Sequence, residues 1–284
     1  MNDRDINDLS LKIYLINLDR ATERLISMQE KLAAVRLPFE RVSAVDGATL
    51  IFPNTEFSER AFRLLHGRRR NPAEVGCYLS HIDCAKRLLA SKAEFALILE
   101  DDLEFPADME QIVRTAIASK ADWDILRLST VNRGRKYPFA KLTPQRSLAI
   151  ALTREKGSGA YLINRRAATW FVEELMPMRL PFDLAFDLEH LAGLKAAFVH
   201  PVPVRQDIGL PSQIQGKRRS YHLPRWKYPT VQPYRAWLEA SRFACRLTRL
   251  LTSVVEARFA PDSRKAPHRE IAGPLSVMSD QGGD

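Results

Sequence analysis

The chain contains 284 residues, of which 45% are hydrophobic and 27% are charged. This balance supports a buried core and excludes a wholly disordered chain, and three scattered cysteines exclude a disulfide framework or a cysteine-rich zinc module. The net charge of +9 is uneven, since 14 Lys and Arg stand against 7 Asp and Glu from Arg205 onward, which leaves only +2 for residues 1–204. A near-neutral body with a basic tail argues against nucleic-acid binding and fits an anionic membrane surface.

The first residues do not have the features of a signal peptide. They are acidic and polar, and they lack the basic segment and the long apolar run of such a leader. No run of about 18 apolar residues is present, so we expect no membrane-spanning helix. The sequence therefore predicts a cytoplasmic protein.

The first half of the chain predicts alternating strands and helices. Residues 11–18 form an apolar, β-rich segment, residues 21–35 place apolar side chains at helical spacing, and residues 39–47 predict a second strand that ends in an Asp-Gly turn. A strand, a helix and a strand in this order are the minimal unit of an α/β fold. Residues 51–70 are expected to be irregular. A helix is predicted over 71–91, with Asn71 as its N-cap and Pro72 at its first position.

The second half continues the same pattern. Further strands are predicted at 94–105, 123–129, 147–153, 158–165 and 196–207, and helices at 107–119 and 168–176, with a proline-bounded segment at 181–194. Residues 131–147 are polar, basic and rich in turn formers, which predicts a mobile loop over a site. The expected α/β domain therefore covers residues 1–208.

The tail has a pattern of its own. Residues 234–260 predict a helix in which arginines alternate with aromatic and aliphatic side chains. Two interpretations remain open: the helix lies on anionic lipid, or it packs on the body with its arginines outward. We expect a basic helical extension over residues 209–260 and a disordered end over 261–284.

The strongest chemical signal is an acidic cluster after a hydrophobic strand. Glu100, Asp101 and Asp102 follow directly on the segment 95–99, and such strand ends form the ligand crevice of an open α/β sheet. Neighbouring carboxylates repel one another unless a cation lies between them, and hard oxygen ligands suit Mg²⁺ or Mn²⁺. Glu100 and Asp102 alternate, so they share one side of the strand end. The alternative is a solvated acidic turn.

Six segments in order carry a family resemblance: 13–25, 39–47, 71–81, 95–102, 157–168 and 181–187. Together they resemble glycosyltransferase family 25, the group that contains bacterial lipopolysaccharide galactosyltransferases and collagen galactosyltransferases. The resemblance covers residues 11–207, about 70% of the chain. It implies a GT-A-like, Rossmann-type fold for nucleotide-diphospho-sugar transfer, with a mixed, mostly parallel sheet flanked by helices.

The resemblance also implies roles for individual residues. Asp102 would be the main metal ligand, assisted by Asp101 or Glu100. The nucleotide sugar would be bound by Asn17, Asp19, Arg24, Asp46, Gly76, Ser80 and His81. An arginine can pair bidentately with phosphate, and a glycine allows close approach to its backbone. For these positions a purely structural role remains an open alternative, and Cys77 and Cys84 are expected to be buried packing thiols.

Two aspartates are candidates for the catalytic base. Inverting sugar transfer needs a carboxylate that takes the proton of the acceptor hydroxyl. Asp183 matches the family's Pro-x-Asp position and is the first candidate, and Asp187, four residues later, is the second. Helix capping is the structural alternative for Asp183. His200, at a predicted strand end, is a possible additional ligand of the metal or the diphosphate.

The leading hypothesis is a metal-dependent hexosyltransferase that uses Mn²⁺ or Mg²⁺. The resemblance implies UDP-galactose as the default donor, a saccharide or lipid-linked glycan of lipopolysaccharide or another cell-surface glycan as acceptor, and an inverting mechanism. We expect the enzyme at the cytoplasmic face of the inner membrane, held there by its basic tail. The alternative is a catalytically inactive protein of the same fold that serves as a peripheral membrane or scaffold component. The sequence leaves the oligomeric state open.

Overall fold

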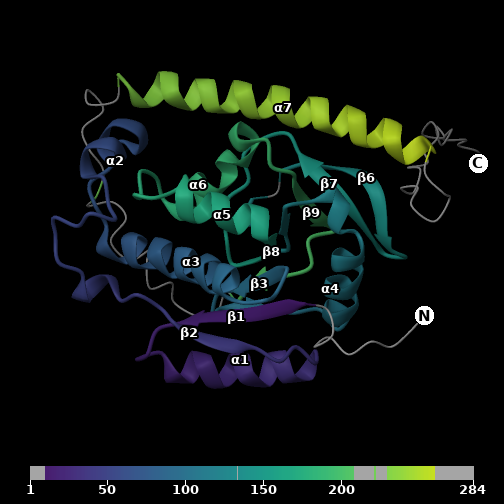
Figure 1. The fold of residues 1–284 in the computed structure, drawn as a ribbon, viewed down its shortest axis with the longest axis horizontal. Coiled ribbons are helices and arrows are strands. Elements are labelled where there is room, and N and C mark those ends of the chain that lie inside the picture. Colours follow the sequence, from purple (N-terminus) through teal and green to yellow (C-terminus); the bar gives the residue numbers. More distant parts are fainter. Residues whose placement is uncertain (1–9, 133, 208–220, 222–228, 260–284) are drawn as a thin grey trace, which may run out of the picture.

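A computed structural model describes residues 10–132, 134–207, 221 and 229–259. Its centre is an eight-stranded sheet in the order β2-β1-β3-β8-β5-β9-β7-β6 (Figure 1). The strands are β1 (Leu11–Asn17), β2 (Glu40–Ser43), β3 (Phe95–Leu99), β5 (Ile125–Arg127), β6 (Lys136–Thr143), β7 (Arg146–Ala151), β8 (Ala160–Asn164) and β9 (Ala196–His200). The pairings leave only β8 and β7 antiparallel to the other strands. The predicted α/β class with a mixed, mostly parallel sheet is therefore confirmed.

Helices cover both faces of the sheet. They are α1 (Thr22–Ala34), α2 (Glu59–His66), α3 (Pro72–Ala90), α4 (Met109–Ala118), α5 (Arg165–Glu173), α6 (Phe182–Ala185) and α7 (Val231–Phe259), with short 3₁₀ turns η2 (Gly47–Thr49), η3 (Lys120–Asp122) and η4 (Phe186–Ala192). In β1, Ile13 and Leu15 join the core under α1 and α4, whereas Tyr14 and Ile16 join the core under α3 and α5. Alternate side chains of a strand point to opposite faces, so each face has its own apolar layer.

The start of α3 is held against the loop that follows β2. Asn71 caps the helix, because its Oδ1 accepts a hydrogen bond from Ala73 N at 3.2 Å, and Pro72 occupies the first turn, as predicted. A Cβ on Gly76 would lie 2.3 Å from Val45 O, and a Cβ on Gly47 would lie 2.1 Å from Pro72 O. Both positions therefore require glycine, because the two backbones meet there.

Two predictions for the middle of the chain are wrong. The segment 131–147, expected to be a loop, contains β6, which pairs with β7 as an antiparallel hairpin with register shifts near Pro138 and Lys141. The lysines and the proline of this segment are unusual in a buried strand, so its sequence does not indicate one. In the structure Lys136 is buried, and its Nζ lies 2.9 Å from Glu155 Oε2. The segment 51–70, expected to be irregular, contains α2. Ser58 caps this helix and Gly67, with φ of 73°, ends it.

Strand β4 (Leu103–Glu104) and strand β10 (Arg205–Gln206) form a small separate ladder. They are antiparallel, and Gln206 faces Leu103 in the register. The strand predicted over 94–105 is thus divided by the three acidic residues, and the strand predicted over 196–207 is divided after His200. This ladder brings the end of the body's chain back beside the acidic cluster.

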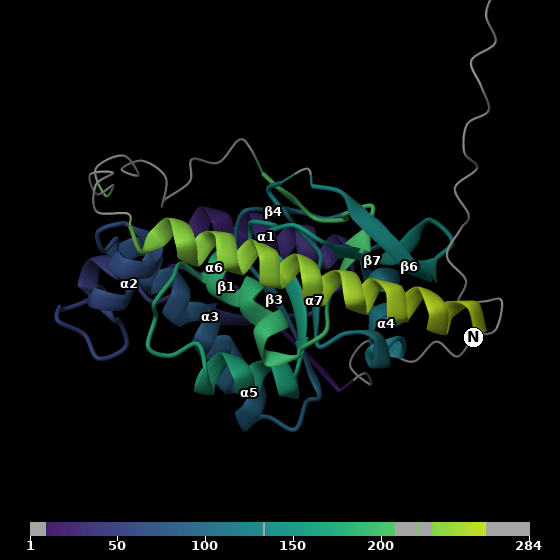
Figure 2. The same cartoon turned by 90° about the horizontal axis from the view of Figure 1, so that it is seen from above.

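The helix predicted in the tail is confirmed as α7, but two of its arginines do not point in the predicted direction. It runs along one side of the body from α2 to β6 (Figures 1 and 2). Arg242 and Arg246 are buried, while Trp237, Phe243 and Leu251 are about half exposed. The predicted alternative in which the helix packs on the body is supported by the contacts of α7 with α2, η4, β6 and β7. The expected outward direction of the arginines is wrong for Arg242 and Arg246, which are buried. Among the described residues, no helix is long and apolar enough to cross a membrane. The predicted disordered end, 261–284, lies outside the described residues.

Candidate active site

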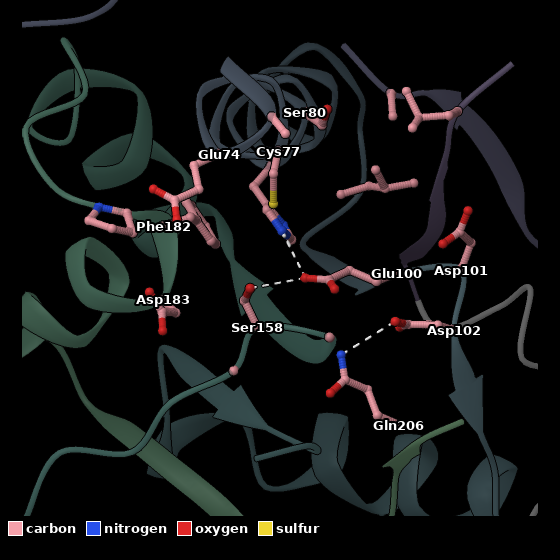
Figure 3. A pocket seen from close by; sticks show the side chains of 18 of the residues that line it. Glu74, Cys77, Ser80, Glu100, Asp101, Asp102, Ser158, Phe182, Asp183 and Gln206 are labelled. Atoms are coloured by element: carbon pink, nitrogen blue, oxygen red, sulfur yellow. Dashed lines mark hydrogen bonds and ion pairs between the residues drawn. The ribbon is translucent and has the colours of Figure 1, made fainter. Parts of the chain in front are cut away.

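A cavity of about 320 Å³ opens where β1 and β3 end. Its wall is built from the loop after β2, the first turns of α3, the acidic cluster after β3, residues 156–159 before β8, and the start of α6 (Figure 3). Parallel strands end at the same edge of a sheet, and this edge is where open α/β sheets bind ligands. The volume lies in the range of about 300–1,000 Å³ that is usual for small-molecule sites.

The three acidic residues have three different environments. Asp101 is neutralised: its Oδ1 accepts from Arg24 Nη1 and its Oδ2 from Asn17 Nδ2, each at 2.8 Å. The interaction with Arg24 is a partly buried ion pair. Of the residues predicted to bind nucleotide, Asn17 and Arg24 thus hold a carboxylate of the acidic cluster. Arg24 also lines the cavity, whereas Asn17 does not.

Glu100 is held by hydrogen bonds. Its Oε1 is 3.3 Å from His81 Nε2 and accepts from Ser158 Oγ at 3.0 Å (Figure 3). Burial opposes the ionisation of Glu100, but the contacts with His81 and Ser158 outweigh it and lower the pKa of the carboxyl group. Glu100 is therefore a carboxylate at neutral pH.

Asp102 is the carboxylate with the fewest compensating contacts. Its Oδ2 accepts a long hydrogen bond of 3.4 Å from Gln206 Nε2 (Figure 3), and its buried Oδ1 has no hydrogen-bond partner among the described residues. Burial, followed by repulsion from Glu100 and Asp101, raises the pKa of Asp102 to about 6. Burying an uncompensated carboxylate oxygen is costly, and a hard divalent cation would relieve that cost. Glu100 and Asp102 therefore fit the donor set of such an ion.

The residues predicted on α3 have distinct positions. His81 lines the cavity; its Nδ1 is 3.0 Å from Tyr161 Oη and its ring stacks on Phe182 at 4.1 Å. Ser80 also reaches the cavity, but its Oγ accepts from Val45 N and donates to Gly76 O. Gly76 does not line the cavity, because the loop after β2 covers it. The close approach predicted at this glycine is thus made by the protein's own backbone.

Two acidic residues predicted to bind nucleotide are paired with arginines. Asp46 lines the cavity, forms an ion pair with Arg20 and accepts from Ala48 N at 2.9 Å as the cap of η2. Asp19 is largely exposed, does not line the cavity, and pairs with Arg41 and Ser43. Arg20, which belongs to the strand end that the resemblance places around the nucleotide, lines the cavity as well.

The two candidates for the catalytic base lie in different environments. Asp183, in the first turn of α6, lines the cavity, and Figure 3 shows it across the cavity from Asp101 and Asp102. Asp187 is fully buried outside the cavity, where its carboxylate pairs with Arg127, Arg242 and Arg246 at 2.8–3.0 Å. Asp187 is therefore out of reach of an acceptor bound in the cavity.

His200 lies outside the cavity at the end of β9, opposite Ser147 in the register. Its predicted contribution to the metal or diphosphate site is not supported by that position. The residues of the cavity wall that sequence reasoning missed include Lys156, Ser158 and Gln206. The glycines on either side of Ser158, Gly157 and Gly159, could have indicated that this segment lies at a site. No sequence pattern around Gln206 indicates such a role.

The comparisons with known proteins identify the family of this chain. A sequence model of glycosyltransferase family 25 (LPS biosynthesis protein) matches residues 10–186. The chain therefore belongs to glycosyltransferase family 25. The matched residues include the acidic cluster, the cavity wall on α3 and Asp183, and they end before α7.

Curated relatives cover part of the chain. Procollagen galactosyltransferase 1-A of Xenopus laevis is 29% identical over 185 residues, which are 61% of this chain and 30% of that protein. A glycosyltransferase 25 family member of Anopheles gambiae is 34% identical over 100 residues, or 33% of this chain and 17% of the other. A probable inactive glycosyltransferase 25 family member 3 of Rattus norvegicus is 26% identical over 150 residues, or 49% and 24%. The chain thus spans about 30% of the length of the first of these relatives.

Solved structures give only a weak likeness. A glycosyltransferase involved in the glycosylation of the major capsid of PBCV-1 is 11% identical, with a TM-score of 0.30 over 57% of this chain and 62% of the other. A197 from STIV is also 11% identical, with a TM-score of 0.38 over 66% and 80%.

Proposed function

We propose that this chain transfers a hexose from a nucleotide sugar to a saccharide acceptor, with the donor bound in the cavity at the ends of β1 and β3. The observation that carries the proposal is Asp102: a carboxylate with one buried, uncompensated oxygen, facing a cavity that Arg20, Arg24 and Lys156 also line. The acidic cluster suits a cation, and basic side chains that line the same cavity suit a diphosphate. Family membership supports the same reaction class.

Asp102 and Glu100 would hold Mn²⁺ or Mg²⁺, which would supply positive charge to the diphosphate as the glycosidic bond breaks. Asp101 has another part in this proposal. Because it is paired with Arg24 and Asn17, it fixes the guanidinium at the cavity wall, where Arg24 can face phosphate oxygens. Of the two residues predicted to assist Asp102, Asp101 or Glu100, the proposal keeps Glu100 as the metal ligand.

Asp183 is the proposed base. It faces the cavity from α6, across from the acidic cluster (Figure 3), so an acceptor hydroxyl bound between them could pass its proton to this carboxylate. Attack from the side opposite the leaving diphosphate gives inversion at the sugar carbon. UDP-galactose is the proposed default donor, and a saccharide of lipopolysaccharide or another cell-surface glycan the proposed acceptor. Action at the cytoplasmic face of the inner membrane also remains a proposal. Arg242 and Arg246 of the basic tail do not support it, because they are buried and cannot contact lipid.

The decisive experiment screens UDP-sugars with Mn²⁺ and compares the wild type with Asp102→Asn. We expect turnover to fall at least about 100-fold, the loss typical when a main electrostatic element of a site is removed, and Mn²⁺ affinity to fall with it. Glu104→Gln is the matched control, because Glu104 is an acidic residue two positions further on that pairs with Lys31 outside the cavity. Unchanged turnover in folded Asp102→Asn protein would refute the metal assignment. Absence of transfer and of UDP-sugar hydrolysis in the wild type would favour the inactive alternative, a property that the name of the rat relative states for that protein.

The assignment of the base is tested separately. Asp183→Asn should lower kcat by about 100-fold or more, since general-base catalysis contributes typically 10²–10⁴-fold, while donor KM and thermal stability change little. Asp187→Asn is the contrasting variant. Because Asp187 is buried among three arginines, its main effect should be on the free energy of unfolding. A folded Asp183→Asn enzyme with wild-type kcat would remove Asp183 from the mechanism.

A further inference from the structure

A thiol, an imidazole and a carboxylate meet on the α3 side of the cavity. Cys77 and His81 lie four residues apart on α3 and so share one face of the helix, and Glu100 follows β3. One ligand atom from each of these three residues lies within 4.8 Å of the other two. Figure 3 shows the Cys77 sulfur directed toward Glu100. All three residues line the cavity.

The imidazole is fixed in place before any ligand arrives. His81 is fully buried, its Nδ1 is 3.0 Å from Tyr161 Oη, and its ring is parallel to Phe182 at 4.1 Å between centroids. This leaves Nε2 directed at Glu100, 3.3 Å away. Histidines that bind metals usually form a hydrogen bond through the other ring nitrogen, which sets the tautomer and the ring orientation. His81 has this arrangement.

The donor set shares Glu100 with the proposed site at Asp102, but it adds a thiol and an imidazole. Oxygen ligands alone suit Mg²⁺ and Mn²⁺, whereas a thiolate and an imidazole select softer ions such as Zn²⁺ and Co²⁺. Burial, and then the negative charges of Glu100 and Asp183, raise the pKa of the Cys77 thiol. Without a metal the thiol is neutral.

We propose that Cys77, His81 and Glu100 form a Zn²⁺ site. Three protein ligands with the fourth position facing a cavity are the pattern of zinc sites that keep a place for water or substrate. Binding of Zn²⁺ converts the Cys77 thiol to a thiolate and releases one proton to solvent. The proposal concerns metal binding by the chain itself and does not depend on transferase activity.

The test uses full-length, metal-free protein titrated with Co²⁺ in the absence of nucleotide. Co²⁺ bound to a thiolate gives a charge-transfer absorption band in the near ultraviolet. We expect this band at one equivalent and its removal by Zn²⁺. Cys77→Ser should abolish the band and lower Zn²⁺ affinity at least tenfold. Cys245→Ser is the matched control, because Cys245 is exposed on α7, and it should keep the band, as should Asp102→Asn.

A second measurement needs no variant of the site. In wild-type protein, Zn²⁺ should slow the alkylation of Cys77 but not that of Cys245, as followed by mass spectrometry of the labelled peptides. The proposal is overturned if folded Cys77→Ser protein keeps the band, if Cys245→Ser loses it, if the wild type shows no band, or if Zn²⁺ leaves Cys77 alkylation unchanged. Loss of Mn²⁺-dependent turnover in Asp102→Asn with the cobalt band intact would separate the two sites.

Discussion

At the scale of single residues, the structure divides chemically identical side chains into different roles. Asp101 and Asp102 are neighbours in the chain, yet Asp101 is paired with Arg24 and Asn17, while Asp102 keeps a buried oxygen without a partner among the described residues. The same division separates Asp183, on the cavity wall, from Asp187, in the core. A carboxylate can serve a ligand only where the protein has not already neutralised it.

Gly76 allows a sharp test at this scale. In an open helix position Gly→Ala gains about 1 kcal/mol. At Gly76 we expect the opposite sign and a loss of about 1–3 kcal/mol or more, because the new Cβ would lie 2.3 Å from Val45 O. Urea unfolding measures the difference. A stability equal to or above that of the wild type would contradict the observed approach of α3 to the loop after β2.

At the scale of elements, α7 is bound to the body by buried charge. Arg246 donates to Glu189 Oε1 at 2.6 Å and to Asp187 Oδ1 at 2.8 Å, and Arg127 links Asp187 to Gly157 O at 2.7 Å. Gly157 belongs to the segment that carries Ser158 into the cavity. The arginines of α7 are thus connected to the cavity wall through Asp187 and Arg127.

Removing one member of this network should lower the free energy of unfolding by several kcal/mol. Arg246→Met leaves Glu189 in the core without its main partner, and breaking a buried ion pair in this way costs about 3–5 kcal/mol. The double variant Arg246→Met with Glu189→Gln should recover part of that loss, because it removes the unpaired charge as well. Thr248→Ala, at an exposed position of the same helix, is the control and should change stability by less than about 0.5 kcal/mol. Equal losses in the single and double variants would contradict this account.

At the scale of the whole molecule, the matched family segment is smaller than the folded unit. The family match ends at residue 186, but the apolar side chains of α7 complete both cores: Leu250 joins one cluster and Tyr234 packs against the other. Val231 and Leu238 are also buried. The predicted domain of residues 1–208 therefore lacks an element that the body buries.

A truncation tests this point. A chain that ends at residue 208 should lose its sharp thermal transition, because Asp187 and Glu189 would remain buried without Arg242 and Arg246. A chain that ends at residue 260 keeps α7 and is the matched control. Circular dichroism and thermal scans compare the two. A cooperative transition of the shorter chain within a few degrees of the control would show that residues 1–208 fold independently.

Local patterns were sufficient to predict much of the architecture. The strand β1, the helix α3 with its Asn71 cap and the strand β3 followed by acidic residues all follow from periodicity and capping chemistry, which act over a few residues. The hairpin of β6 and β7 did not, because the polar strand β6 is stabilised by its pairing with β7 and by the burial of Lys136 against Glu155. Helix α2 carried capping signals in Ser58 and Gly67 that were overlooked.

The sequence by itself determined the α/β class, the place of the acidic cluster at a strand end and the family. Only the tertiary structure decided which of these carboxylates remains available. Arg24 reaches Asp101 across 77 residues of sequence, and Arg246 reaches Asp187 across 59. The free energy of a buried charge depends on the neighbours that folding brings to it, and no local pattern in the chain specifies those neighbours.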